Sequence, residues 1–147
     1  MDNIFWMAMA VVAGSLLPLL GAFNAKLGAA IASPLHASVI SFTVGTLAMV
    51  TYVFATRQSV AWAGAGSAPW YAWLGGLCGA FSLTAIILTY PKLGPGLGFG
   101  LLIAGQLVIS AILEHFNILV AEPHPMSLLR ACGIALVLAG VAMIRIF

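Results

Sequence analysis

The chain contains 147 residues, of which 63% are hydrophobic and only 5% are charged, and its formal net charge is +2. Soluble domains contain about 25% charged residues, so this composition excludes a water-soluble surface and indicates an integral membrane protein surrounded by a lipid bilayer. The basic residues are few and scattered, which excludes the dense positive surface of a nucleic-acid-binding protein.

The first predicted membrane helix covers residues 4–30. Its apolar run is longer than the core of a signal peptide, so we expect it to be retained as a membrane span. Pro18 should kink this helix or break one of its hydrogen bonds, and small residues along one face allow a second helix to approach closely. Asn24 and Lys26 make the half after Pro18 more polar. Asn24 is a candidate substrate ligand, and Lys26 lies either at the membrane interface or in a cavity.

Two further helices are predicted at 35–56 and 70–90, separated by a loop rich in Ala, Gly and Ser. On the third helix, Trp73 and Thr84 share a face with small residues. That face is either the wall of a ligand site or a surface for close helix packing. In the first case Trp73 supplies an apolar wall and Thr84 is a further candidate for substrate binding.

The fourth predicted helix, 97–120, is apolar enough to cross a bilayer but contains several polar residues. Gln106, Ser110, Glu114 and Asn117 lie at about 0°, 40°, 80° and 20° on a helix that turns about 100° per residue. They therefore form one polar stripe. Such a stripe either lines a wet cavity or substrate site, or only joins helices through hydrogen bonds.

Glu114 is the only acidic residue within the predicted apolar segments. A carboxylate near the middle of a lipid-facing helix costs about 2.5 to 3.5 kcal/mol, so it usually faces a protein interior or water. At about 1.5 Å per residue, Glu114 lies roughly 9 Å from the helix centre, whereas Gln106 and Ser110 lie near it. We therefore interpret Gln106 and Ser110 as candidate substrate ligands and Glu114 as a candidate coupling or gating residue.

A tight turn is predicted at 90–96, and a polar loop leads to the fifth predicted helix at 126–147. Alanines at every fourth position of this last helix favour close helix pairing, as at a dimer interface. Cys78 and Cys132 lie in apolar runs without CxxC spacing, and we interpret them as small buried residues. The sequence shows neither a metal-ligand cluster nor a nucleophile with a base, so we expect no enzyme, no metal and no cofactor.

Five spans place the two termini on opposite sides of the membrane, which assigns each basic residue to a side. The N-terminal side holds two basic residues and the other side three; these are Arg57 and Arg130 against Lys26, Lys92 and Arg145. Because the bias of Lys and Arg sets orientation, so small a difference permits either insertion or both.

This balance indicates how the chain assembles. Many transporters consist of two halves of inverted topology around a site at the midplane. A five-span chain without orientation bias has the properties of one such half. The predicted fold is therefore all-α, one transmembrane domain over residues 1–147 with five transmembrane helices, paired with an inverted copy of itself or with a paralogue as an antiparallel dimer.

A set of short motifs extends over essentially the whole chain. These are Leu16-Leu17-Pro18, Asn24-Ala25-Lys26-Leu27-Gly28, Ser33-Pro34, Ser41-Phe42 with Gly45-Thr46, Trp73-Leu74-Gly75-Gly76, Pro91-Lys92-Leu93-Gly94, Gly105-Gln106-Leu107, Glu114-His115-Phe116 and Leu138-Ala139-Gly140-Val141. The set resembles the YdcZ-type family of inner-membrane exporters, within the drug/metabolite transporter superfamily, and is more specific than any one motif.

The resemblance implies a bacterial inner-membrane protein of five helices that acts as an antiparallel dimer of identical or paired subunits, or as fused ten-helix relatives. The family position that Glu114 matches often holds an aspartate, so here the acid is carried on one more methylene group. The resemblance names a transporter without naming its cargo.

We therefore expect a secondary transporter that exports small organic molecules by alternating access. One alternative is a dual-topology ion channel, which needs a continuous polar path or a ring of charges, whereas only the fourth helix carries a strong polar stripe. The other alternative is a membrane scaffold subunit without transport, in which the stripe joins helices.

Overall fold

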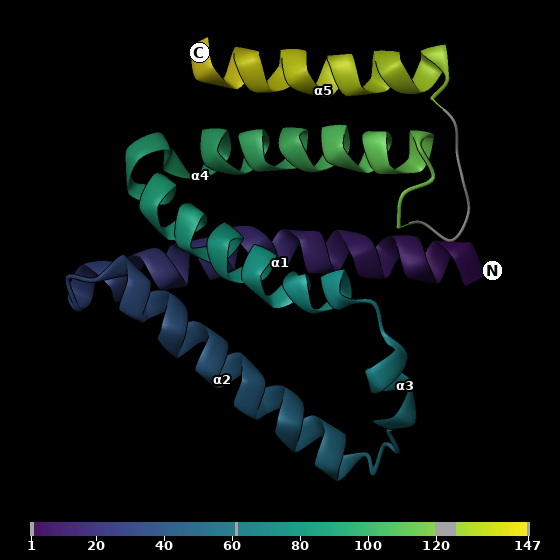
Figure 1. The fold of residues 1–147 in the computed structure, drawn as a ribbon. Helices are drawn as coiled ribbons and strands as arrows, with labels where there is room; N and C mark the ends of the chain where they lie inside the picture. The colour runs from purple at the N-terminus through teal and green to yellow at the C-terminus, as the bar shows by residue number, and fades with distance from the viewer. Residues whose placement is uncertain (1, 61, 120–125, 147) are drawn as a thin grey trace. The chain divides into compact units, whose positions relative to one another are not determined.

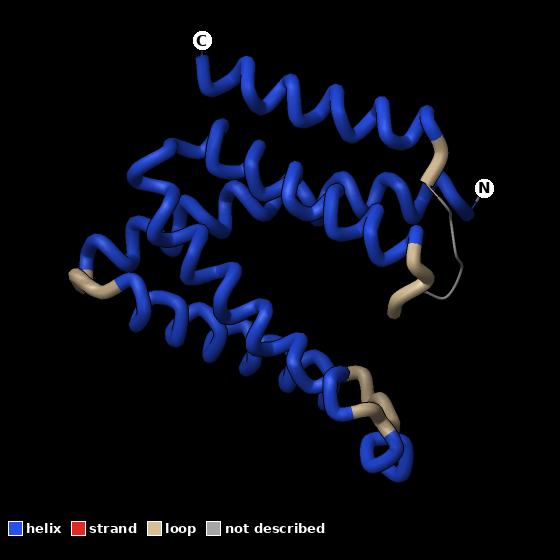
Figure 2. The backbone as a smooth tube through the Cα atoms, turned by 45° about the horizontal axis from the view of Figure 1, so that its top comes forward, coloured by secondary structure: helices blue, strands red, loops and turns tan. Residues whose placement is uncertain are grey.

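The computed structural model describes residues 2–60, 62–119 and 126–146, and these residues form helices joined by loops, without strands (Figure 1, Figure 2). The helices are α1 (Asp2–Ala30), α2 (Pro34–Ala55), α3 (Trp62–Ser67), the 3-10 helix η1 (Trp70–Leu74), α4 (Gly75–His115) and α5 (Leu128–Ile146). This arrangement confirms the predicted all-α class.

Four helical stretches among the described residues are long and apolar enough to cross a membrane. They are Asn3–Ala30, Pro34–Ala55, Trp70–His115 and Leu128–Ile146. The third contains 46 residues, and a helix of that length extends about 69 Å, more than twice the hydrocarbon thickness of about 30 Å. This one stretch is therefore long enough for two crossings.

Helix α4 consists of two helical segments that meet at a kink inside the predicted turn at 90–96, and the break is shorter than predicted. The helix runs from Gly75 to His115, and only Gly94, with φ 74° and ψ 167°, leaves the helical conformation. Pro95 explains the position of the break, because its ring disfavours a helical conformation in the residue before it. Pro95 itself suits the first turn of the following helical segment, where its missing N–H has no intrahelical partner.

The chain divides into two compact units. The first unit is Met1–Lys92 and the second is Leu93–Phe147. The boundary lies beside the break in α4, so the two helical segments of α4 belong to different units.

The core of the first unit lies where the end of α1, the start of α2 and the first segment of α4 meet. Ala37 of α2 and Leu83 and Ile87 of α4 are buried there. A Cβ atom added at Gly28 of α1 would lie 3.2 Å from Cγ2 of Ile87 and 3.4 Å from Cα of Pro34. The predicted small-residue face of the first helix therefore packs closely against both neighbours at this point.

The second unit is a hairpin in which the second segment of α4 and α5 lie side by side and run antiparallel (Figure 1, Figure 2). A Cβ atom added at Gly100 would lie 3.2 Å from Cγ2 of Val141, and one added at Gly96 would lie 3.9 Å from Cγ2 of Ile144. The absence of a side chain at Gly100 therefore makes room for Val141 on the facing helix.

Three helices end in a similar hydrogen-bonded motif, and each time the closing residue is not glycine. Ala32 after α1, Arg57 after α2 and Asn117 after α4 have φ angles of 51°, 50° and 53°. After α1, the backbone N–H of Ser33 donates to the carbonyl of Gly28 at 2.9 Å, and the N–H of Ala32 also bonds back to the helix. This is the Schellman pattern, which satisfies carbonyls at the end of a helix.

The end of α4 corrects the predicted boundary of the fourth helix. That helix was expected to reach residue 120, which lies outside the described residues, but α4 ends at His115. Asn117 takes the left-handed conformation that closes the helix, so it lies beyond the polar stripe and not on it. The residues of the stripe that remain helical are Gln106, Ser110 and Glu114.

Other predicted features are corrected in the same way. The loop before the third helix contains the short helix α3, and the third helix begins with 3-10 rather than α-helical geometry over Trp70–Leu74. The last helix covers Leu128–Ile146, and residue 147 lies outside the described residues. Cys78 and Cys132 are exposed and not buried in the described chain.

Replacing Gly94 with alanine should lower the free energy of unfolding by about 1 to 3 kcal/mol, because its φ and ψ angles are accessible essentially only to glycine. Circular dichroism of the purified protein during thermal unfolding in detergent measures this change. Gly98→Ala is the matched control, since a Cβ atom at Gly98 meets open space and alanine favours a helix. A Gly94→Ala protein as stable as the Gly98→Ala protein would contradict the break.

Replacing Ala32 with glycine should raise the free energy of unfolding by about 1 kcal/mol, because the left-handed conformation costs other residues roughly 1 to 2 kcal/mol. The control is Ala10→Gly inside α1, which should lower stability by about 0.5 to 1 kcal/mol. The same unfolding experiment measures both. Equal losses in the two variants would show that Ala32 does not close the helix as described.

Candidate functional site

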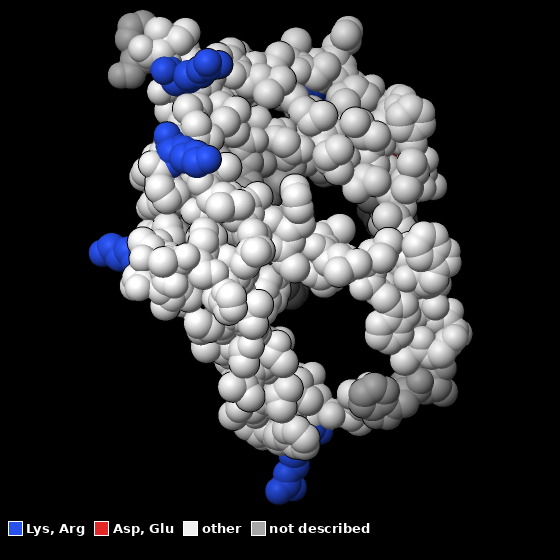
Figure 3. All heavy atoms as spheres, turned by 60° about the vertical axis from the view of Figure 1, so that its left-hand side comes forward, with Lys and Arg blue, Asp and Glu red and all other residues white. Residues whose placement is uncertain are grey.

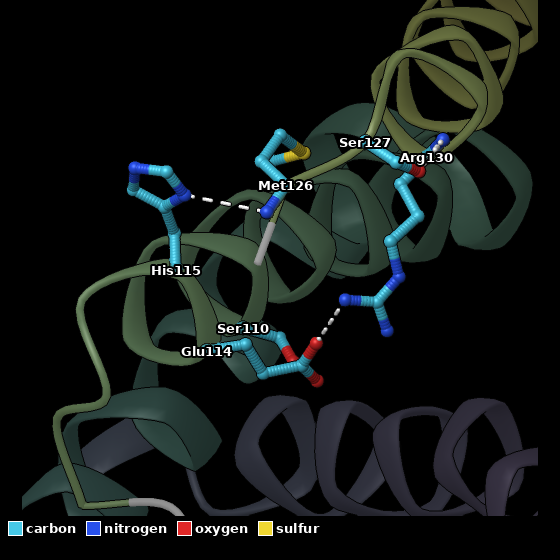
Figure 4. Close-up of polar contacts among 6 residues, drawn as sticks. All are labelled: Ser110, Glu114, His115, Met126, Ser127 and Arg130. Carbon is cyan, nitrogen blue, oxygen red and sulfur yellow. Dashed lines mark hydrogen bonds and ion pairs between the residues drawn. The ribbon is translucent and has the colours of Figure 1, made fainter. Parts of the chain in front are cut away.

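The second unit contains an ion pair between α4 and α5. Nη1 of Arg130 lies 2.8 Å from Oε2 of Glu114, and the hydroxyl group of Ser110 donates to Oε1 of the same carboxylate at 3.4 Å (Figure 4). Both carboxylate oxygens therefore have a partner, and the contact with the arginine is the shorter and stronger of the two. The side chain of Glu114 is 27% exposed and that of Arg130 is 44% exposed, so the pair is partly shielded.

Local hydrogen bonds hold both charged residues at the same end of the hairpin. Just before α5, the hydroxyl group of Ser127 accepts from the backbone N–H of Arg130 at 3.3 Å, as an N-cap residue does. The ring Nδ1 of His115 accepts from the backbone N–H of Met126 at 3.3 Å (Figure 4). Because the helices run antiparallel, the end of α4 and the start of α5 then bring Glu114 opposite Arg130.

A cavity of about 320 Å³ lies beside the ion pair. Apolar residues of both helices supply most of its wall, among them Leu107 of α4 and Ile134 and Val137 of α5. Among the described residues, Glu114 and Arg130 supply its charges. A mainly apolar pocket with a few converging polar groups is the usual form of a small-molecule site.

Two residues of the predicted stripe meet at this cavity. Ser110 and Glu114 line it and contact each other. Gln106 lies one turn earlier on α4, is exposed and does not belong to the cavity wall. Of the residues predicted on this helix, the structure therefore brings together the hydroxyl and the carboxylate but not the amide.

In the first unit, Thr84 contacts a hydroxyl group on another helix. Oγ of Ser38 lies 2.9 Å from Oγ1 of Thr84, and Oγ1 of Thr84 lies 2.8 Å from the carbonyl of Ala80. Oγ of Ser38 also lies 3.2 Å from the carbonyl of Pro34. Because each hydroxyl group has one proton to donate, one of the two donates to the other and the second donates to a carbonyl of its own helix. This pair joins α2 to α4 and lines a mainly apolar groove of about 610 Å³, together with Phe42 and Gly76.

Asn24 and Trp73 also belong to the first unit, but they lie in different surroundings. Asn24 is 6% exposed, and its side-chain amide donates to the carbonyl of Leu20 on its own helix at 2.9 Å. Trp73 lies on η1 and is 66% exposed. Neither residue lines the groove beside Thr84, so the structure does not gather these three predicted residues around one cavity.

Arg130 is the site residue that the polar stripe does not indicate, because it lies on the other helix of the hairpin. The sequence nevertheless contains a signal for it. Glu114 lies near the end of one predicted helix and Arg130 near the start of the next, so antiparallel packing places them at the same end. Such a pairing is distinctive in this chain, because on the face shown in Figure 3 the Lys and Arg atoms form isolated groups on a largely uncharged surface.

A comparison with protein-family models finds a match over nearly the whole chain. Residues 5–143 match the family described as "Putative inner membrane exporter, YdcZ". The chain belongs to the YdcZ family. This result confirms the resemblance that the motifs indicate. A search of curated proteins and a search of solved structures each found no match.

Membership of the YdcZ family agrees with the structure in two respects. The family is described as one of inner-membrane exporters, and the apolar helices fit a membrane transporter. The matched region also includes both Glu114 and Arg130 and the residues that line the cavity beside them.

The free energies of unfolding of Glu114→Gln, Arg130→Gln and the double variant should reveal a coupling of about 1 kcal/mol, because the pair is only partly shielded from solvent. Each single variant already removes the ion pair, so the double variant should lose less stability than the sum of the two. Unfolding in detergent measures all three. Glu114→Gln combined with Arg145→Gln is the control and should be additive, since Arg145 lies at the far end of α5.

Additive effects of Glu114→Gln and Arg130→Gln would contradict a direct ion pair.

Proposed function

We propose that this YdcZ-family protein is a secondary transporter that exports small organic molecules across the bacterial inner membrane by alternating access. The family description and the apolar helices support this proposal. Five crossings would be made by α1, α2, the two segments of α4 on either side of Gly94, and α5. Transport in this proposal needs no covalent chemistry, no metal and no bound cofactor.

The observation that carries the proposal is the ion pair of Glu114 and Arg130 at a mainly apolar cavity. Charged residues within membrane-spanning segments are costly and often mark a substrate or ion pathway. A pair that only joined two helices would not need a cavity beside it. We therefore assign Ser110 to substrate binding and Glu114 to coupling or gating, together with Arg130.

Gln106, Asn24, Trp73 and Thr84 are proposed to complete the transport pathway outside this cavity. Of these four residues, Thr84 has the surroundings most suitable for binding a substrate, because it lines a groove. Asn24 is committed to a carbonyl of its own helix, so it would have to exchange that hydrogen bond to reach a substrate.

The working assembly is proposed to be an antiparallel dimer, either of two copies of this chain or of this chain with a paralogue. The near balance of Lys and Arg between the two sides supports insertion in both orientations. A reporter fused to the C-terminus and assayed on both sides of the membrane tests this directly. Mixed orientation would favour the homodimer, and a single orientation would require an oppositely oriented partner.

Transport is tested with the protein reconstituted in lipid vesicles and offered a panel of radiolabelled organic cations, anions and zwitterions. At least one class should show saturable flux and countertransport. Glu114→Gln should reduce this flux about tenfold or more, the effect of losing one charged contact of about 1.4 kcal/mol. Asp2→Asn, which removes an acidic residue from α1, is the matched control and should transport normally.

The same vesicles separate the alternatives. Single-channel currents without countertransport would support the ion channel and contradict the transporter. A Glu114→Gln or Gln106→Leu protein that inserts and dimerises normally but loses transport would contradict the scaffold subunit.

A further inference from the structure

We propose that a groove between the second segment of α4 and α5 binds one acyl chain of an anionic phospholipid, and that Arg145 binds the phosphate of the same lipid. The groove lies at the end of the hairpin opposite the Glu114–Arg130 pair, so this lipid site is distinct from the proposed transport site. The proposal rests on the composition of the groove, its depth in the bilayer and the position of its charge.

The groove combines an apolar wall with one cationic side chain. Its volume is about 510 Å³. Apolar residues of both helices form the wall, among them Leu101 of α4 and Leu138 of α5, and Arg145 is the one charged residue among the described residues that line it. A cation beside an apolar groove matches an amphiphile with a negative head and an apolar chain, as in basic lipid sites between membrane helices.

The helix ends place the groove within one leaflet of the bilayer. Helix α5 ends at Ile146, so Arg145 lies where a membrane span reaches the lipid headgroups. From Leu97 to Ala104, seven residues further along α4, the groove extends about 10 Å at 1.5 Å per residue. One leaflet of hydrocarbon is about 15 Å thick, half of the whole core. The groove therefore covers the depth at which the first part of an acyl chain lies below its phosphate.

The side chain of Arg145 is available for a lipid headgroup. Arg145 is exposed, and no described residue forms a hydrogen bond or an ion pair with its side chain. Glu114, the acidic residue that the structure describes in this unit, pairs with Arg130 at the other end of the hairpin. A guanidinium group can donate two parallel hydrogen bonds to a phosphate, which favours the phosphate of a lipid as its partner.

Small side chains leave the space that the acyl chain would occupy. Val141 packs against the position of Gly100, and Val141 and Ala104 are both buried where they line the groove. Ala142 also lines the groove but is exposed. A larger side chain at Ala142 would therefore fill the groove without replacing the residues packed beneath it.

Native mass spectrometry of the full-length protein, stripped of lipid and kept in detergent, tests the headgroup contact. Dioleoylphosphatidylglycerol is the anionic probe, and dioleoylphosphatidylcholine has the same chains but a headgroup without net charge. The first phosphatidylglycerol molecule should bind about fivefold tighter than the first phosphatidylcholine molecule, which corresponds to about 1 kcal/mol for one interfacial charge. Equal affinities for the two lipids would overturn the proposal.

Two variants separate the headgroup contact from the chain contact. Arg145→Gln should remove the preference for phosphatidylglycerol, whereas Ala142→Phe should weaken both lipids about threefold or more. The matched controls are Arg57→Gln, after the end of α2, and Ala135→Phe, on α5; both positions lie outside the groove, and both variants should keep the original affinities. Loss of the preference in Arg57→Gln, or unchanged binding in Ala142→Phe, would overturn the site.

Photo-cross-linking locates the lipid along the chain. Phosphatidylglycerol with a diazirine group in one acyl chain should label peptides that contain residues 97–104 or 138–146, and Ala142→Phe should abolish this labelling. Labelling spread evenly over all helices would overturn the proposal. A change in the monomer–dimer ratio of Ala142→Phe with unchanged labelling would assign the groove to a second copy of the chain and also overturn it. None of these measurements depends on transport, so the proposed function can fail while the lipid site stands.

Discussion

Wherever this chain lies in hydrocarbon, its backbone must satisfy its own hydrogen bonds, and this constraint governs where each helix begins and ends. The carbonyls at the ends of α1, α2 and α4 are bonded by the turns that follow, although each turn needs a left-handed residue. Because the closing residues are Ala32, Arg57 and Asn117, the chain accepts local strain in exchange for satisfied carbonyls. The helix ends are therefore determined by hydrogen bonding more than by local propensity.

The same constraint applies to polar side chains. The hydroxyl groups of Ser38 and Thr84 share one hydrogen bond between them, and the remaining proton goes to a helix carbonyl. The side-chain amide of Asn24 donates to a carbonyl of its own helix. Glu114 cannot be satisfied in this way, because a carboxylate needs an opposite charge to be tolerated in apolar surroundings. Its contact with Arg130 therefore defines the candidate site. The cavity beside that contact has mainly apolar walls.

Hydropathy was enough to predict the helices, because long apolar runs leave a chain few alternatives in a membrane. The break at Gly94 could also have been located from the sequence, since the following Pro95 disfavours a helical conformation there. Hydropathy did not locate the end of α4, because the residues after Asn117 are also apolar, although asparagine is, after glycine, the residue that most readily closes a helix in the left-handed conformation. The polar stripe on one helix does not identify the partner of Glu114 on the facing helix, and only the antiparallel order of the last two helices places Arg130 at the same end.

The hairpin of α4 and α5 has an energetic consequence for biosynthesis. Either helix alone would carry one charge of the Glu114–Arg130 pair towards the bilayer without the opposite charge of the other helix, which is unfavourable. Together they bring two opposite charges to the same end of the hairpin. Partitioning from the translocon into lipid is therefore favoured when both segments enter as one unit.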